Sequence, residues 1–187
     1  MPVERLGDVV LDIGFGGGEA LIELAEVRAH EHVIGVDVHT PGIAAVLDAV
    51  EARALRNVRV VEGDVIEFIA RIPLRSLAVV RIFFPDPWPK RRQRNRRLVR
   101  PDVTERLVPL LREGGTIELA TDAADYATQM QLVCDATAGL HGGVIERPSW
   151  RPATRFERRG IDEGRQPVDL RYVASVSSPS ESSSALR

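Results

Sequence analysis

Short apolar runs alternate along this chain with longer segments of helical periodicity, and this alternation constrains the fold more than any other feature. The apolar runs predict strands at residues 9–13, 33–38, 58–61, 77–84 and 116–120. Apolar residues recurring three and four positions apart predict helices at residues 20–29, 43–55, 65–72, 103–111 and 123–138. Repeated strand–helix order predicts an α/β fold with a doubly wound, mostly parallel sheet, which binds ligands beyond the carboxyl ends of its strands.

The end of the chain departs from this alternation. Two strand candidates, residues 143–146 and 170–176, are separated by a long polar connection, and we expect them to complete a seven-stranded sheet with an antiparallel edge. Gly114 and Gly115 are expected to stop the helix before the fifth strand. Residues 177–187 are mostly serine and predict a disordered tail, which leaves one domain over residues 1–176.

Length and composition limit the class of protein. The 187 residues are 44% hydrophobic, which is enough for one sizeable core. No apolar run approaches the roughly 20 residues that span a bilayer, and the first five residues lack an apolar targeting segment, so we expect a cytoplasmic protein without membrane contact. Cys134 is the only cysteine, which excludes an internal disulfide, and the four histidines lack metal-ligand spacing, so no metal is expected.

Glycines alternate where the first predicted strand passes into a helix. Gly14, Gly16 and Gly18 allow backbone amides to approach a ligand that a Cβ would obstruct. Such a turn also occurs in nicotinamide-binding proteins and as a simple tight turn. The dinucleotide fingerprint, however, requires glycine where Glu19 stands, and Asp12 disfavours a pyrophosphate. S-adenosylmethionine carries a sulfonium and an ammonium group, which favour a nearby carboxylate such as Asp12.

Two further acids stand at the ends of predicted strands. Asp37 ends the second strand, where a carboxylate accepts hydrogen bonds from both ribose hydroxyls of either cofactor. Asp64 follows the third strand and is placed either to meet the adenine edge or to cap the next helix. Asp37 therefore supports a ribose without choosing between the two cofactors, and the preference for S-adenosylmethionine rests on Asp12 and the glycine spacing.

A dense run of cations follows the fourth predicted strand, and residues 90–97 of it are called the basic stretch below. The cations of the basic stretch are Lys90, Arg91, Arg92, Arg94, Arg96 and Arg97, and Arg100 follows shortly after it. The whole chain has a net charge of −2, so positive charge is concentrated here on an otherwise acidic protein. A local basic surface favours oriented docking of nucleic acid, and a solvated helix start or a charged loop is the alternative.

Asp86 lies between two prolines immediately before the basic stretch. Pro85 and Pro87 restrict the backbone strongly and hold the carboxylate in one geometry. Phe84 and Trp88 supply flat surfaces on which an unstacked base can stack, at roughly 1–3 kcal/mol per base. The alternative is a rigid surface turn in which Trp88 packs on the core.

Three motifs carry a resemblance to a known family. They are FFPDPWPKRRQRNRRLV at residues 83–99, LATD at residues 119–122 and RPATRFERRG at residues 151–160. Through them the chain resembles the bacterial tRNA (guanine-N7)-methyltransferases over residues 9–175. The resemblance implies a class I methyltransferase fold, S-adenosylmethionine as methyl donor, and methylation of guanosine 46 at N7 in the variable loop of tRNA.

The resemblance also implies roles for single residues. Cofactor contacts fall on Asp12, Asp37, Asp64 and Asp86, and Asp86 is also the catalytic position. Substrate or RNA contacts fall on Lys90, Arg92, Arg94, Arg96, Arg97, Asp122, Thr154, Arg155, Phe156 and Glu157. The family commonly has glutamate where Asp12 and Asp37 stand, and it has residues before the first strand, so we expect an N-terminal extension to be missing here.

The chemistry of guanine N7 limits what the protein must supply. This nitrogen has an in-plane lone pair and no proton, so its methylation requires alignment and no general base. We therefore expect Asp86 to orient the reactants and to favour the developing positive charge. Two other functions stay open: methylation of another RNA or base atom, and RNA binding with weak catalysis. A monomer and a homodimer are equally compatible with the sequence.

Overall fold

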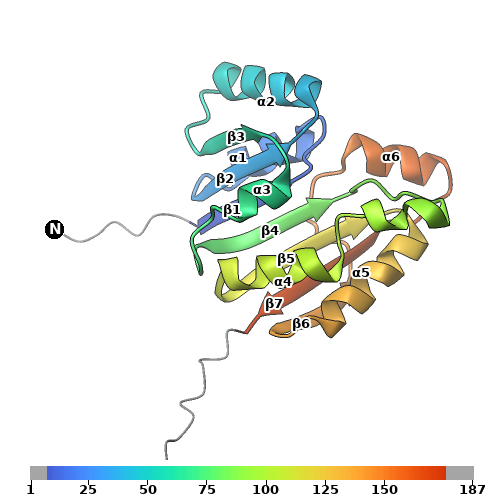
Figure 1. Cartoon of the computed structure of the whole chain (residues 1–187). Coiled ribbons are helices and arrows are strands. Elements are labelled where there is room, and N and C mark those ends of the chain that lie inside the picture. The colour runs from blue at the N-terminus through green and yellow to red at the C-terminus, as the bar shows by residue number, and fades with distance from the viewer. Residues whose placement is uncertain (1–7, 176–187) are drawn as a thin grey trace, which may run out of the picture.

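The computed structural model describes residues 8–175, which form one seven-stranded sheet covered by helices (Figure 1). The strand order is β3-β2-β1-β4-β5-β7-β6. The strands are β1 (Asp8–Ile13), β2 (Glu31–Asp37), β3 (Val58–Glu62), β4 (Leu77–Phe83), β5 (Leu111–Thr121), β6 (Leu140–Ile145) and β7 (Val168–Ala174). Strands β1 to β5 pair in parallel, whereas β7 is antiparallel to both β5 and β6. The predicted fold class, including its antiparallel edge, is confirmed.

Helices cover both faces of this sheet. They are α1 (Glu19–Val27), α2 (Thr40–Ala52), α3 (Val65–Ile69), α4 (Pro101–Leu107), α5 (Ala124–Ala136) and α6 (Arg155–Asp162), with 3₁₀ turns η1 (Arg91–Arg96) and η2 (Val108–Leu110). Successive strand residues point to opposite faces, so Val10 packs with Leu21 of α1 and Val46 of α2, while Leu11 packs with Leu107 of α4 and Met130 of α5. Each such buried aliphatic side chain contributes roughly 1.5–3 kcal/mol.

The helix predicted over residues 103–111 ends earlier than expected. Helix α4 stops at Leu107, and the next turn is 3₁₀ and contains Pro109, whose backbone nitrogen has no hydrogen to donate. Gly114 and Gly115 lie inside β5, where the register against β4 shifts and Gly114 has a φ of 70°. The prediction that these glycines stop a helix is therefore wrong: they accommodate a bulge.

The long polar connection before β7 contains a helix that apolar periodicity does not reveal. The Oγ1 atom of Thr154 accepts a hydrogen bond from the backbone amide of Glu157 at 3.1 Å and caps α6. Threonine followed three residues later by glutamate is a known signature of a helix start. The predicted tail, residues 177–187, lies outside the described residues.

Cys134 is buried in α5, and burial raises the pKa of its thiol to about 12. Across residues 8–175, none of the helices combines the length and apolar character needed to cross a bilayer. In the same part of the chain, no group of three or more His, Cys, Asp or Glu side chains could hold a metal ion.

Candidate functional site

A cleft of about 540 Å³ opens at the carboxyl ends of β1, β2 and β4, where the strand order of the sheet changes direction. The predicted site residues that line it are Gly14, Gly16, Asp37, Asp86, Arg96, Arg155 and Phe156. An adjoining hollow is lined by Asp12, Phe84 and Thr154, among others. Residues that are widely separated in the sequence are thus brought to one end of the sheet.

Asp37 fixes the glycine turn to the end of β2. Its Oδ2 atom accepts a hydrogen bond from the Gly16 amide at 2.7 Å. Its Oδ1 atom accepts from the amides of Val38 and His39 at 2.7 and 2.9 Å. Each carboxylate oxygen has two lone pairs, so Asp37 can hold the turn and still accept a hydrogen bond from a ligand in the cleft.

The glycines of the turn serve two different purposes. Gly14 and Gly16 have φ angles of 71° and 57°, a conformation that favours glycine, and both face the cleft. Gly18 has a φ of 79° and begins α1, and a Cβ there would lie only 2.0 Å from a methyl carbon of Val46. Gly18 is therefore required by the packing of α1 on α2, and its contact with the cofactor stays a prediction.

Asp12 is buried in the centre of the sheet, with only 3% of its surface exposed. It pairs in register with Gly35 of β2 and with Arg81 of β4. Burial raises the pKa of the Asp12 carboxyl to about 6, although the positive charge of Arg81 lowers it. A carboxyl in this position gains strongly from a cation placed in the adjoining hollow.

Asp64 caps α3, as one of the two sequence interpretations allows. Its Oδ1 atom accepts a hydrogen bond from the Ile66 amide at 2.7 Å. Among residues 8–175, the lining of the cleft does not include Asp64. Its contact with adenine stays a prediction.

The loop that carries Asp86, residues 85–89, is called the proline loop, and unusual backbone conformations occur just before it and within it. Phe84 and Trp88 have φ angles of 51° and 41°, which cost roughly 1–3 kcal/mol each for bulky residues. Trp88 lines the cleft, and the guanidinium of Arg96 lies 5.0 Å from the centre of its ring. The side chain of Asp86 is exposed and lines the same cleft. The loop therefore presents a carboxylate and an aromatic face together.

The basic stretch contains η1 and is mostly exposed. Its exposed cations are Lys90, Arg91, Arg92, Arg94 and Arg96. Arg94 forms an ion pair with Asp125 of α5 at 3.0 Å, but its side chain is still 48% exposed. Arg97 differs from these residues because its side chain is 1% exposed and donates hydrogen bonds to protein acceptors. In this conformation Arg97 cannot present its charge to a phosphate, which differs from the RNA contact predicted for it.

The late segment, residues 151–157, places two side chains at the cleft. The ring of Phe156 is 49% exposed and approaches Gly16 so closely that a Cβ there would lie 3.5 Å from it. The guanidinium of Arg155 lies 5.5 Å from the centre of the Phe156 ring. The glycine turn and the late segment thus meet across the site.

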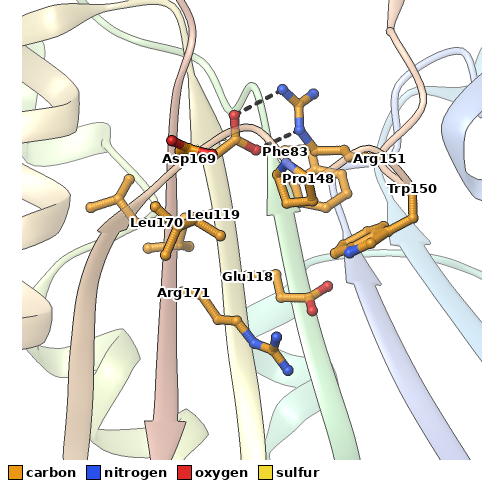
Figure 2. A pocket seen from close by; sticks show the side chains of 11 residues that line it. Phe83, Glu118, Leu119, Pro148, Trp150, Arg151, Asp169, Leu170 and Arg171 are labelled. Carbon is orange, nitrogen blue, oxygen red and sulfur yellow. Dashed lines mark hydrogen bonds and ion pairs between the residues drawn. The ribbon is translucent and has the colours of Figure 1, made fainter.

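Glu157 is 1% exposed and holds the late segment against the protein interior. Its carboxylate accepts hydrogen bonds from Arg147 at 2.7 Å and from Arg151 at 2.8 and 2.9 Å. Burial raises the pKa of Glu157, but the hydrogen bonds from Arg147 and Arg151 outweigh it and hold the pKa below its usual value. Arg151 also donates to Asp169 of β7 at 2.5 and 3.0 Å (Figure 2). Glu157 therefore faces the protein interior, which differs from the substrate contact predicted for it.

Asp122 lies at the end of β5, beneath α6. Its Oδ2 atom accepts a hydrogen bond from Arg165 at 2.7 Å. A Cβ on Gly160 of α6 would lie 2.5 Å from that same atom, so the helix packs closely on the carboxylate. Asp122 is placed to position α6, and its contact with substrate stays a prediction.

Sequence reasoning missed a buried ionic network on the sheet. Arg81 of β4 is fully buried and donates to Glu31 at 2.9 Å and to Glu118 at 3.3 Å. A separate cavity of about 220 Å³ lies beside Glu118 and is bordered by Trp150 and Arg171 (Figure 2). The signal for this network was an arginine inside the apolar run of residues 77–84, because a buried charge requires partners.

The comparisons with known proteins agree with this architecture. The family described as "Putative methyltransferase" matches residues 7–170. The tRNA (guanine-N(7)-)-methyltransferase of Acidithiobacillus ferrooxidans is 44% identical over 169 residues, which cover 88% of this chain and 74% of that protein. The protein of the same name from Thiobacillus denitrificans is 45% identical over 170 residues, which cover 89% of this chain and 75% of that protein.

Solved structures support the fold alone. The crystal structure of an rRNA methylase from Streptococcus thermophilus has a TM-score of 0.62 at 11% identity, over 91% of this chain and 89% of that chain. The sequence matches cover most of this chain at more than 40% identity and confirm the predicted resemblance. The chain therefore belongs to the tRNA (guanine-N7)-methyltransferase family.

Proposed function

We propose that this protein transfers the methyl group of S-adenosylmethionine to N7 of guanosine 46 in the variable loop of tRNA. The observation that carries the proposal is the convergence of three features on one cleft: the glycine turn with Asp37, the exposed carboxylate of Asp86, and the aromatic rings of Trp88 and Phe156. The names of the relatives give the reaction class, and the resemblance gives the nucleotide position. A tRNA substrate is consistent with a cytoplasmic enzyme.

The residues present suit S-adenosylmethionine. Gly14 faces open space, since a Cβ built there meets no atom within 4 Å. Asp37 lines the cleft and can accept one further hydrogen bond, which suits a ribose hydroxyl, and the buried carboxyl of Asp12 suits a cationic ammonium group. When bound, the cofactor supplies an electrophilic methyl group on a sulfonium.

Asp86 acts here through position and charge. The lone pair of guanine N7 forms the new carbon–nitrogen bond as the carbon–sulfur bond breaks, and no proton leaves N7. The guanine ring becomes positively charged, so a carboxylate held nearby stabilises the transition state more than the ground state. Trp88 and Phe156 offer stacking surfaces that hold the base in the alignment this displacement requires.

The exposed part of the basic stretch is placed to bind the tRNA backbone. Arg96 lies over Trp88 at the cleft, so a phosphate bound along residues 90–96 would belong to a nucleotide close to the reacting base. Where tertiary pairing occupies N7 in this tRNA region, the local RNA fold must open before the base enters the cleft.

Replacement of Asp86 by Asn tests the assignment, because it keeps the shape and removes the charge. We expect kcat to fall by roughly 100-fold or more while tRNA affinity stays close to that of the wild type. Asp102→Asn is the matched control, since Asp102 is an exposed acid that pairs with Arg100. The methylated nucleotide is mapped after incubation with total tRNA. A methyl group on another atom, or full turnover in Asp86→Asn, would contradict the proposal.

Asp37→Ala tests the cofactor. Loss of hydrogen bonds to a charged group costs about 1.5–3 kcal/mol, which corresponds to roughly 10- to 150-fold weaker binding of S-adenosylmethionine by calorimetry. Asp64→Ala shows whether Asp64 contributes to binding beyond its role as a helix cap. Undiminished affinity in Asp37→Ala, or preferential binding of NAD by the wild type, would refute the cofactor assignment.

A further inference from the structure

We propose that Arg97 is a positioning residue, which holds the proline loop and thereby Asp86 in the geometry for methyl transfer. This inference rests on the proposed function, because it concerns the loop that carries the carboxylate at the reaction site. From the sequence alone, Arg97 is indistinguishable from the RNA-binding arginines beside it.

All three donor nitrogens of the Arg97 guanidinium are used inside the protein. Its Nε atom donates to the carbonyl oxygen of Pro87 at 2.8 Å. Its Nη1 and Nη2 atoms donate to Gln129 at 2.9 Å and to Asp125 at 2.6 Å, respectively. Pro87 directly follows Asp86, so Arg97 connects the neighbour of the proposed catalytic residue to helix α5.

Further side chains of helix α5 contact Arg97 and the backbone that follows it. The ring of Tyr126 is fully buried and lies 4.6 Å from the Arg97 guanidinium. The Tyr126 hydroxyl accepts a hydrogen bond from the Val99 amide at 3.0 Å, and Gln129 donates to the Val99 carbonyl at 3.1 Å. The same two side chains of α5 therefore fix both Arg97 and the backbone two residues beyond it.

The proline loop has few other means of attachment. Pro85, Pro87 and Pro89 have no amide hydrogen to donate. Within residues 8–175, the bond from Arg97 to the Pro87 carbonyl is the only hydrogen bond that joins residues 85–89 to the rest of the protein. Trp88 in the same loop holds a φ of 41°, which a bulky residue keeps only when its surroundings impose it. Arg97 supplies that constraint.

Arg94 offers a contrast at the same acceptor. Its Nη2 atom contacts the same Oδ2 atom of Asp125 at 3.0 Å, but its side chain is about half exposed and makes no bond to the proline loop. Arg94 can leave Asp125 for a phosphate, whereas Arg97 cannot do so without releasing the Pro87 carbonyl.

Kinetics of the full chain with tRNA and S-adenosylmethionine test the proposal through Arg97→Lys and Arg94→Lys. Lysine keeps the charge that a phosphate requires but cannot donate to Pro87, Gln129 and Asp125 in the same fork. We expect Arg97→Lys to lower kcat about 10-fold or more, with KM for tRNA within about twofold of the wild type. Arg94→Lys also keeps the charge and loses only the planar guanidinium geometry, so it is expected to act on KM for tRNA and not on kcat.

A spectroscopic readout separates this inference from the proposed function. In a Trp150→Phe background Trp88 is the remaining tryptophan, so its fluorescence anisotropy reports the order of the proline loop without any need for turnover. We expect lower Trp88 anisotropy in Arg97→Lys and in Arg97→Met than in the parent. Normal kcat with a raised KM, or unchanged anisotropy in a folded variant, would overturn the proposal. If Arg97→Met does not fold, the lysine variant decides the question.

Discussion

The basic stretch and the late segment both line the cleft, and each contains a buried arginine together with at least one exposed arginine. The buried residue of the basic stretch, Arg97, pairs with a carboxylate that is still 44% exposed, that of Asp125. Arg151 of the late segment is instead enclosed by two buried carboxylates, those of Glu157 and Asp169. The cost of removing an arginine depends on how deeply its partners are buried, because a deeply buried partner that is left alone keeps an uncompensated charge. Neighbouring arginines in one sequence run can therefore have different tasks.

Arg151→Met should have the largest effect on stability. The substitution leaves the carboxylates of Glu157 and Asp169 buried with less compensation, which costs about 3–5 kcal/mol in the free energy of unfolding. Urea denaturation measures this loss, and Arg155→Met, an exposed neighbour, serves as the matched control. A loss below about 1 kcal/mol would show that partner burial does not control the cost.

Asp12 is also a buried acid, but unlike Glu157 and Asp169 it accepts no hydrogen bond from an arginine in the described part of the chain. Burial raises its pKa from 3.8 to about 6, against the influence of Arg81, and nearby Asp37 and Glu118 raise it further. A raised pKa means that the folded state binds the proton more tightly than the unfolded state. The resulting stability is fully present below pH 4 and is lost as pH rises through 6.

Comparison with Asp12→Asn isolates this effect, since asparagine does not titrate. The difference in unfolding free energy between wild type and variant should decline by about 2 kcal/mol between pH 4 and pH 7. Urea denaturation at several pH values measures it. A constant difference would mean that folding does not change the pKa of Asp12.

Three exposed arginines should affect RNA binding and leave stability nearly unchanged. In the triple variant Arg91→Ala, Arg92→Ala and Arg94→Ala, the log–log slope of tRNA affinity against salt should decrease by roughly 0.7–0.9 for each phosphate that the variant no longer binds. Each substitution should change unfolding free energy by less than about 0.5 kcal/mol. Titrations at several salt concentrations measure the slope. A wild-type slope in the variant would show that this surface is merely solvated.

Removal of an arginine from an exposed ion pair should have the smallest effect on the free energy of unfolding. Arg53 of the α2 C-terminus pairs with Glu26 of α1 at 2.6 Å, and the two side chains are 49% and 39% exposed. Arg53→Ala should lower the free energy of unfolding by only about 0.5 kcal/mol, since water screens such a pair. Thermal unfolding measures the change. A loss comparable to that of Arg151→Met would break the link between burial and cost.

The sequence predicted the features that depend on local pattern. Apolar periodicity located the strands and most helices within a few residues, and the meeting of strand ends placed Asp37 and Asp86 at one cleft. It could not separate Arg97 from Arg96, because the burial of Arg97 is determined by Asp125 and Gln129, which come about thirty residues later on α5.

Sequence reasoning missed helix α6 and the buried position of Glu157 for related reasons. The helix has few apolar residues, so periodicity does not reveal it, although Thr154 and Glu157 have the spacing of a helix start. The orientation of Glu157 follows from the arginines that surround it, and Arg81 depends on Glu31, 50 residues earlier in the chain. Local pattern predicts elements, whereas charge pairing over long separations determines which side chains remain available.

The buried thiol of Cys134 gives this protein a practical advantage for labelling. Thiolates are the reactive form of cysteine, and a thiol with a pKa of about 12 contains almost none at neutral pH. Cys134 is the only cysteine in the chain, so a cysteine introduced by Lys90→Cys would be the single reactive site in the folded protein. A dye attached there would report the arrival and departure of tRNA at the basic stretch in real time.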